Sequence, residues 1–289
     1  GFARRTIHLS AMQGWGGVGQ GVMLSAARRE IDLALQSRFR DAMSREAGVA
    51  VDQQFLSAIE ALQNELGETD LSTALGDFFN GFSELANAPT DTSLRAVILE
   101  QGQSLAEGIS SLREEYGQLG AQTVDGLETA VDSVNALLEQ IAALNEQIAE
   151  AGSVDDPVLM DQRDVLLDEL SQYLDVVVVQ RESGMSDVLV GSVPVVLGGE
   201  ARGVALRLEN AGHGIPEATL RVLDDGSILP VASGSIGGLL RQRDETLVPV
   251  IESLETFARE LIWQVNRIHS QGQGLSGYDS VRAGVSVSD

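Results

Sequence analysis

Carboxylates are the most abundant side chains of this 289-residue chain that could do chemistry, and one short segment places three charged groups within four residues. The segment is Asp161-Gln162-Arg163-Asp164 (DQRD), inside the otherwise apolar run DPVLMDQRDVLLDELSQYL at 156–174. Paired carboxylates can act as general acid and base, or can hold a cation. Because the chain has 43 acidic side chains, such pairs also arise by chance on solvated helix faces.

The spacing of its neighbours places DQRD on a helix. Asp156 is expected as the N-cap and Pro157 as the first helical residue. Steps of four and three residues connect an apolar stripe that includes the arginine: Leu159, Arg163, Leu166, Leu170 and Tyr173. Asp161, Asp164 and Asp168 then point outward. Since an unpaired guanidinium is too costly to bury, we expect Arg163 to bind a carboxylate or several carbonyls of a neighbouring element.

Other patterns that could support catalysis or ligand binding are weak. His8, His213 and His269 are far apart, no GxSxG motif accompanies them, and a Ser-His-Asp triad would have to assemble in space. Gly14, Gly16 and Gly19 match GxGxxG, but the surrounding sequence does not alternate between strands and helices. With no Cys, thiolate metal sites are excluded. We therefore predict no catalytic residue, no metal ligand, no cofactor and no cofactor-binding residue.

The net charge limits the partners that the chain can bind. The formal charge is −24, from 43 acidic and 19 basic side chains, and such a surface repels nucleic acid and anionic lipid. No segment approaches the roughly 20 apolar residues of a membrane helix, and GFARRTIHLS lacks the apolar core of a secretory signal. We expect no nucleic acid and no membrane among the partners.

Periodicity predicts an α+β fold, mainly α: an elongated bundle of long antiparallel helices with an antiparallel β-sheet subdomain of about five or six strands. Residues 1–30 are expected to form an extended Gly-rich arm, with a short strand at Thr6–Leu9 and no regular structure through QGWGGVGQGV. Residues 31–174 form a helical rod domain, broken by LGETDLS and ANAPTDTS. Short β-branched runs separated by turns predict the β subdomain at 175–235.

A long helix at 236–270 is expected to return to the rod, and 271–289 to be a linker toward a missing outer domain. If Thr246 is the N-cap of the regular apolar series that starts at Leu247, Pro249 loses no intrahelical hydrogen bond. The helix at 93–151 has a seam that ends Leu138, Ile141, Asn145, Ile148. Asn145 replaces an apolar residue there, so we interpret it as a device that fixes register.

Several motifs together resemble the flagellar hook-associated protein 1 family over nearly the whole chain. They are GFARRT, GGVGQGV, DLSTALGDFFNGFSELANAPTDTSLRAVIL, VNALLEQIAALNEQI, MDQRDVLLDELS, GGLLRQRDETLVP and WQVNRIHSQG. The structural signature carried by the resemblance comprises Asn145, Asp161, Gln162, Arg163, Asp164, Asn266 and His269. The order of the DFFNGF, LNEQI, DQRD and VNRIHSQG motifs makes the combination specific.

The resemblance implies structural work and no enzyme activity. Family members form the hook-filament junction of the bacterial flagellum, stacked in a tubular axial assembly. Implied partners are the hook protein, the second hook-associated protein, other copies of the chain, and an export chaperone before secretion. Localisation would be extracellular, after export through the flagellar secretion channel without a cleaved signal peptide.

The resemblance also implies that the terminal helical segments that drive polymerisation are missing from both ends, so we expect this fragment to be monomeric in solution. A related axial protein, either the second hook-associated protein or flagellin, is the nearest alternative. An acidic hydrolase with carboxylates on its sheet turns and a secreted coiled-coil adhesin are alternatives from other classes. A concave pocket with converging acids would favour the hydrolase.

Overall fold

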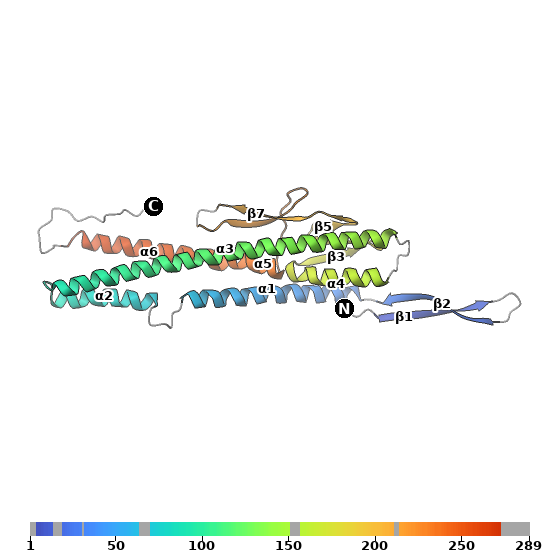
Figure 1. Ribbon diagram of the computed structural model, residues 1–289, viewed down its shortest axis with the longest axis horizontal. Coiled ribbons are helices and arrows are strands. Elements are labelled where there is room, and N and C mark those ends of the chain that lie inside the picture. Colours follow the sequence, from blue (N-terminus) through green and yellow to red (C-terminus); the bar gives the residue numbers. More distant parts are fainter. Residues whose placement is uncertain are drawn as a thin grey trace. The chain divides into compact units, whose positions relative to one another are not determined.

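The computed structural model describes residues 4–13, 19–30, 32–63, 70–150, 157–210 and 214–272. Figure 1 labels helices α1 to α6 and several of the strands. The helices are α1 (Leu33–Gln63), α2 (Leu71–Asn87), α3 (Thr92–Glu150), α4 (Pro157–Tyr173), α5 (Gly234–Gln242), the π-helical turn η1 (Arg243–Leu247) and α6 (Val248–His269). The predicted fold class, mainly helical α+β, is confirmed.

Two compact units divide the chain, and both are built from separated segments. Unit 1 comprises Gly1–Asp52, Val124–Glu209 and Glu217–Leu240, whereas unit 2 comprises Gln53–Thr123, Asn210–Pro216 and Arg241–Asp289. Helices α1 and α3 supply residues to both units. The domain limits expected from the sequence follow the chain segment by segment and stay a prediction.

In unit 1, α4 lies beside the second half of α3, and six short strands adjoin these helices (Figure 1). The strands are β3 (Val176–Gln180), β4 (Ser186–Val190), β5 (Val193–Leu197), β6 (Glu200–Ala201), β7 (Val204–Glu209) and β8 (Glu217–Val222). All pair antiparallel, as predicted, but they form a four-stranded sheet β3-β4-β5-β6 and a separate pair β7-β8. The division is possible because each hairpin buries its apolar side chains against the helices.

One continuous hydrophobic core joins the helices and sheets of unit 1. Its fully buried side chains include Leu127, Val134, Leu138, Ile141, Leu167, Leu170, Val188, Val196 and Ile236. Burial stabilises the fold by about 1.5–3 kcal/mol for each such side chain relative to an exposed one. The seam predicted on the second half of α3 is therefore the side that packs on α4 and the strands.

The N-terminal segment of unit 1 forms a hairpin of two long strands, β1 (Arg4–Gln13) and β2 (Gly19–Glu30). The register pairs Arg4 with Glu30 and Gln13 with Gly19, with two shifts along the ladder. The expected strand Thr6–Leu9 is thus part of β1. The expectation of no regular structure through residue 22 is wrong at Gly19–Val22, because hydrogen bonds to a paired strand offset the low β-propensity of glycine. The glycine run at 14–18 lies outside the described residues.

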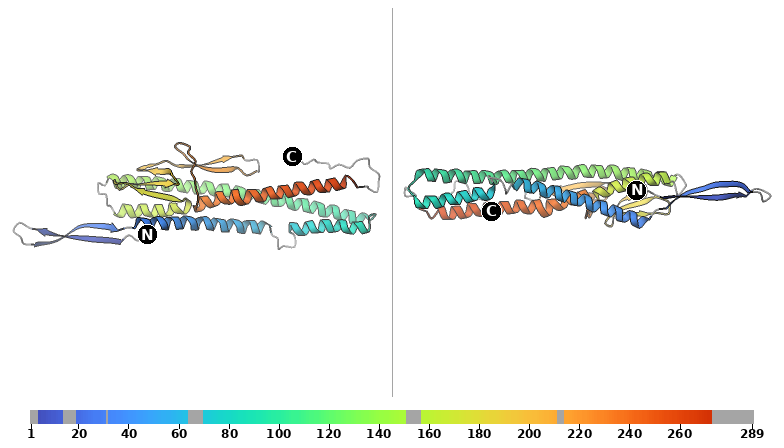
Figure 2. Two further views of the ribbon diagram at one scale, coloured as in Figure 1. Left: turned by 180° about the vertical axis from the view of Figure 1, so that it is seen from behind. Right: turned by 90° about the horizontal axis from the view of Figure 1, so that it is seen from below.

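Unit 2 contains α2, the first half of α3 and α6, which run side by side in both views of Figure 2. Phe78 of α2 packs with Ile98 and Leu105 of α3, and Leu261 of α6 packs against the same cluster. Tyr116 of α3 packs instead with Leu247 and Ile251, near the start of α6. Since residue numbers fall along α3 as they rise along α6, the two helices are antiparallel, which confirms the predicted arrangement.

The helical run predicted at 236–270 begins two residues earlier, and it has no N-cap at Thr246. The chain is helical from Gly234, and a π-helical turn at Arg243–Leu247 connects α5 with α6. Thr246 is therefore inside the helical run and is not the N-cap; its hydroxyl donates to Gln242 Oε1 at 2.7 Å. The π turn accommodates Pro249, which has no backbone N–H, because it shifts the hydrogen-bond pattern: Val248 N donates to Arg243 O.

No helix in the described ranges is long and apolar enough to cross a membrane.

Candidate functional site

The side chain of Asn145 is at the centre of a buried polar network in unit 1. It is fully buried on α3, and its Nδ2 donates to Ser186 O at 2.7 Å and to Gly198 O at 2.6 Å. Its Oδ1 accepts from Ser186 N at 3.0 Å and from Arg163 Nη1 at 3.0 Å. One amide thereby connects α3 to α4, to the first residue of β4 and to the turn after β5.

Arg163 extends this network from α4. It is 1% exposed, and its Nη1 donates to Gly184 O at 2.8 Å as well as to Asn145 Oδ1. The expectation that Arg163 binds carbonyls of neighbouring elements is confirmed. A buried guanidinium bonded through Nη1 in this way fixes the position of α4 against the turn, since displacement would separate a buried charge from these acceptors.

Glycines in left-handed conformations bring the carbonyls of two turns to this network. Gly184 has φ of 85° and Gly198 has φ of 62°, which residues with a Cβ rarely adopt. The turn at Gly184 connects β3 to β4, and the turn at Gly198 connects β5 to β6. The Gly-containing turns of the sequence therefore set the hydrogen-bond acceptors of Arg163 and Asn145.

A second polar cluster lies on another side of α4. Arg40 of α1 is 5% exposed, and its Nη2 donates to Asp164 Oδ1 at 3.1 Å while its Nε donates to Asp168 Oδ1 at 2.8 Å. Gln36 Nε2 donates to Asp164 Oδ2 at 2.9 Å. The expectation that Asp161, Asp164 and Asp168 point outward is therefore wrong for Asp164, which is 9% exposed, and for Asp168, which pairs with Arg40. Helix α4 packs on α1 as well as α3, so two of its faces are covered.

The four positions of DQRD have four different environments. Gln162 is exposed and Asp161 is half-buried, whereas Arg163 and Asp164 are buried on different sides of α4. The expected N-cap Asp156 lies outside the described residues, and Pro157 begins α4 as predicted. This segment is thus a packing element with one charge for each covered face.

Arg40 is the main residue that reasoning from the sequence missed. A signal was present: Phe55 and Ile59 begin a buried series that continues toward the N-terminus through Gly48, Ser44 and Arg40 at helical spacing. These residues are small or polar, so a search for apolar periodicity ends before it reaches them. Ser44 and Arg40 are both buried.

The other two signature residues belong to unit 2. Asn266 is half-buried on α6, and His269 is exposed at its last position. The structure brings Asn145, Arg163 and Asp164 together around α4, within unit 1. His213 lies outside the described residues.

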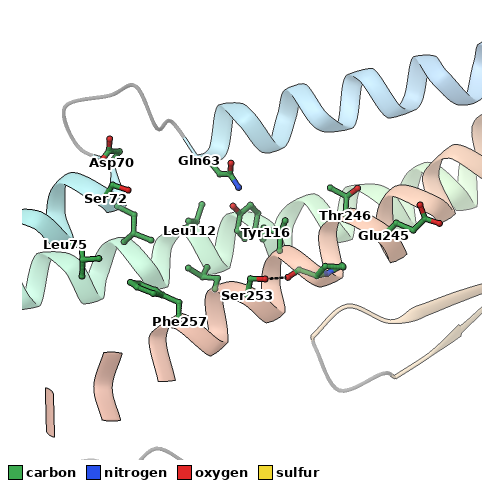
Figure 3. A pocket seen from close by; sticks show the side chains of 14 residues that line it. Gln63, Asp70, Ser72, Leu75, Leu112, Tyr116, Glu245, Thr246, Ser253 and Phe257 are labelled. Atoms are coloured by element: carbon green, nitrogen blue, oxygen red, sulfur yellow. Dashed lines mark hydrogen bonds between the residues drawn. The ribbon is translucent and has the colours of Figure 1, made fainter. Parts of the chain in front are cut away.

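A hollow of unit 2 lies between α2, α3 and α6 (Figure 3) and has a volume of about 500 Å³. Leu75, Leu112 and Phe257 are among the apolar side chains that line it, and Asp70 and Glu245 are its acidic residues. The two carboxylates lie in separate elements, and Asp70 is the N-cap of α2, where it accepts from Thr73 N. No converging group of acids, the feature that would favour the hydrolase, lines this hollow.

Electrostatic shifts in the described residues reflect local hydrogen bonds. Ser227 N and the side chain of Ser227, together with the Arg202 guanidinium, lower the pKa of Asp225 to about 2. The hydrogen bonds at Thr73 lower the pKa of Asp70. Both carboxylates are therefore held ionised in turns or caps. Among the described residues, no group of three or more His, Cys, Asp or Glu side chains could hold a metal ion.

Comparison with known proteins gives a consistent result. The sequence profile of a family described as "flagellar hook-associated protein FlgK helical domain" matches residues 56–282. Flagellar hook-associated protein 1 of Bacillus subtilis is 32% identical over 175 residues, which are 58% of this chain and 34% of the relative. The protein of the same name from Escherichia coli is 26% identical over 296 residues, covering 96% of this chain and 53% of the relative.

A solved structure has the same fold. The flagellar hook junction protein FlgK from Burkholderia pseudomallei superposes with a TM-score of 0.72 at 28% identity, over 82% of this chain and 44% of that protein. The chain spans about half the length, or less, of the curated relatives it matches.

Proposed function

We propose that this chain, which belongs to the family of the flagellar hook-associated protein FlgK helical domain, is a structural subunit of the bacterial flagellum at the hook-filament junction. The match of the family over residues 56–282 carries the proposal. The likeness to the flagellar hook junction protein of Burkholderia pseudomallei supports it independently, because it rests on the path of the backbone.

Within that function, the described side chains serve rigidity rather than catalysis. A subunit of a tubular assembly must keep its shape under mechanical load, and directional bonds in a dry interior allow one arrangement of α1, α3, α4 and the turns. Asn145, Asp161, Gln162, Arg163 and Asp164 are the signature of this arrangement in unit 1. Asn266 and His269 are the corresponding signature in α6. No catalytic role is proposed for any of them.

The proposal includes partners and location. The partners are the hook protein, the second hook-associated protein, other copies of the same subunit, and an export chaperone before secretion. The subunit is extracellular, after export through the flagellar secretion channel. Residues 1–30 form the arm, 31–174 and 236–270 the helical rod, and 175–235 the β subdomain, with 271–289 as a linker. This isolated chain is proposed to be a monomer in solution.

Deletion of the gene in the source bacterium tests the proposal. The expected phenotype is hooks that remain intact, filaments that are short or absent, and filament protein shed into the medium. Expression of the full-length gene in trans should restore filaments, and this control separates loss of the subunit from effects on neighbouring genes. Normal filaments in the deletion strain would contradict the proposed function.

A further inference from the structure

The outer face of α6 combines exposed apolar and basic side chains. Trp263 is 55% exposed and Ile262 is 42% exposed, whereas Ile251 and Leu254, earlier in the same helix, are buried. Arg267 lies over the Trp263 ring, 5.3 Å from its centroid, and its Nη2 donates to Gln264 Oε1 at 2.9 Å. Arg259 is also exposed, one turn before Trp263. We call Arg259, Ile262, Trp263 and Arg267 the α6 patch.

This combination of residue types is typical of protein–protein interfaces. Trp and Arg are the residue types that contribute most to binding energy in protein interfaces. The hydrogen bond that Arg267 donates to Gln264 and the stacking on Trp263 hold the Arg267 side chain in place, so less conformational entropy is lost when a partner binds. The patch also borders a hollow of about 330 Å³ between α3 and α6, which Ile262 and Asn266 help to line. An apolar side chain of a partner could enter it.

Charge indicates the class of partner. The α6 patch has two basic side chains around an exposed Trp in a chain of net charge −24, and Glu260 beside it accepts a hydrogen bond from Gln264 Nε2 at 2.6 Å. An acidic surface with exposed apolar groups is the complement of such a patch. The α2–α3 hairpin of unit 2 has this composition: Phe79 is 51% and Phe82 is 44% exposed. The acidic side chains Asp77, Glu84 and Glu100 are exposed on the same hairpin.

The hairpin presents its phenylalanines rigidly. Phe79 and Phe82 each pack edge-on against Phe78, with ring centroids 5.5 Å and 5.1 Å apart. Phe78 itself is buried against α3. Both surfaces are therefore preorganised parts of unit 2, and each is complementary to the other in charge and in apolar character.

We propose that the α6 patch of one copy binds the α2–α3 hairpin of a second copy of this chain, with Arg267 paired to Glu84 and Trp263 against Phe79 and Phe82. The inference rests on the proposed function, since it names the surface through which axial subunits contact one another. Two different surfaces make the contact heterologous, so it repeats from subunit to subunit and closes a ring or continues as a helix. Contact between two copies of the same patch would bring like charges together.

Cysteine cross-linking tests the contact, because the chain contains no Cys of its own. The full-length gene is expressed in the source bacterium as Glu84→Cys, as Arg267→Cys, and as the double variant, and assembled junctions are isolated and oxidised. The double variant should give a ladder of disulfide-linked multimers, and co-expressed single variants should give dimers. Each single variant on its own should give monomers. The matched control is Glu84→Cys with Glu128→Cys, an exposed residue of α3 in unit 1, which should give no ladder.

A charge exchange provides a second readout that needs no cross-link. Arg267→Glu should reduce the number of filament-bearing hooks, and adding Glu84→Arg should restore it, whereas a shared effect on folding would make the double variant worse. Absence of the ladder, or a ladder in the control pair, would overturn the inference. So would unchanged filament numbers in Arg267→Glu cells. If these results came from a bacterium whose deletion strain lacks filaments, the contact would be rejected and the junction function would stand.

Discussion

The interiors of the two units are stabilised by different kinds of interaction. Unit 1 surrounds α4 with buried hydrogen bonds from Asn145, Arg163 and Arg40, in addition to a continuous apolar core. Unit 2 has two smaller apolar clusters and leaves hollows of about 500 and 330 Å³ between its helices. Directional bonds allow one arrangement, whereas apolar contacts tolerate several. Unit 1 is thus built for uniqueness of shape and unit 2 for adaptability.

The largest expected effect tests whether the network at Asn145 holds unit 1 together. Asn145→Leu removes four hydrogen bonds and leaves Arg163 and the backbone of Ser186 short of partners. We expect a loss of about 3–5 kcal/mol in the free energy of unfolding, measured by urea denaturation. Asn135→Leu is the matched control, since Asn135 on the same helix bonds only to the backbone of Val204 in the described structure. It should lose about 1–2 kcal/mol. Equal losses in the free energy of unfolding would show that the buried network at Asn145 stabilises unit 1 no more than the bonds of Asn135 do.

A smaller but still large effect is expected at Gly234, where the chain enters α5. Its φ is 82°, and a Cβ there would be 2.3 Å from Tyr173 O. Gly234→Ala should lower the free energy of unfolding by about 3 kcal/mol, because left-handed strain adds to a clash with backbone that cannot move aside. Gly226→Ala has a similar φ of 72° and open space around it, so strain alone should cost about 1–2 kcal/mol. Thermal unfolding followed by circular dichroism compares the two.

Substitutions that enlarge a side chain test the difference in packing between the two units. Ala258→Leu adds three carbons beside the 330 Å³ hollow of unit 2, and should raise the free energy of unfolding by up to about 1 kcal/mol. Ala142→Leu adds the same atoms to the close-packed core of unit 1 and should lower it by about 1–3 kcal/mol. Urea denaturation of both variants measures the difference. If both were destabilised equally, the contrast in packing between the units would be wrong.

The smallest expected effect is the dependence of stability on pH through the Asp225 carboxyl. Because the pKa of Asp225 is lowered to about 2 from 3.8, its ionised form stabilises the folded chain above pH 3.8, and this contribution is lost as the pH falls toward 2. NMR titration should place the midpoint of the Asp225 carboxyl near pH 2. In Arg202→Gln the midpoint should move upward only in part, since the bonds from Ser227 remain. A midpoint near 3.8 in the unaltered chain would contradict the turn geometry.

Much of the fold could be predicted from the periodicity of the sequence. The helix at 93–151 is present as α3 within one residue at each end, and the start of α4 at Pro157 is as expected. The π turn before α6 was missed because one proline can be accommodated by a cap or by a changed hydrogen-bond pattern. Only tertiary contacts decide between them, here the burial of Leu247 and the bond from Arg243 Nε to Pro216 O. The division of the strands into two sheets was missed because strand patterns do not encode which neighbours pair.

The sequence by itself determined that Arg163 is buried and that Asn145 interrupts an apolar seam, because both follow from helical spacing. It could not determine that the two side chains bind each other, nor that Asp164 faces Arg40. Those residues are 18 and 124 positions apart, and their meeting depends on how α1, α3 and α4 pack. A helix period fixes the direction of a side chain relative to its own axis. Only the tertiary structure places a second helix in that direction.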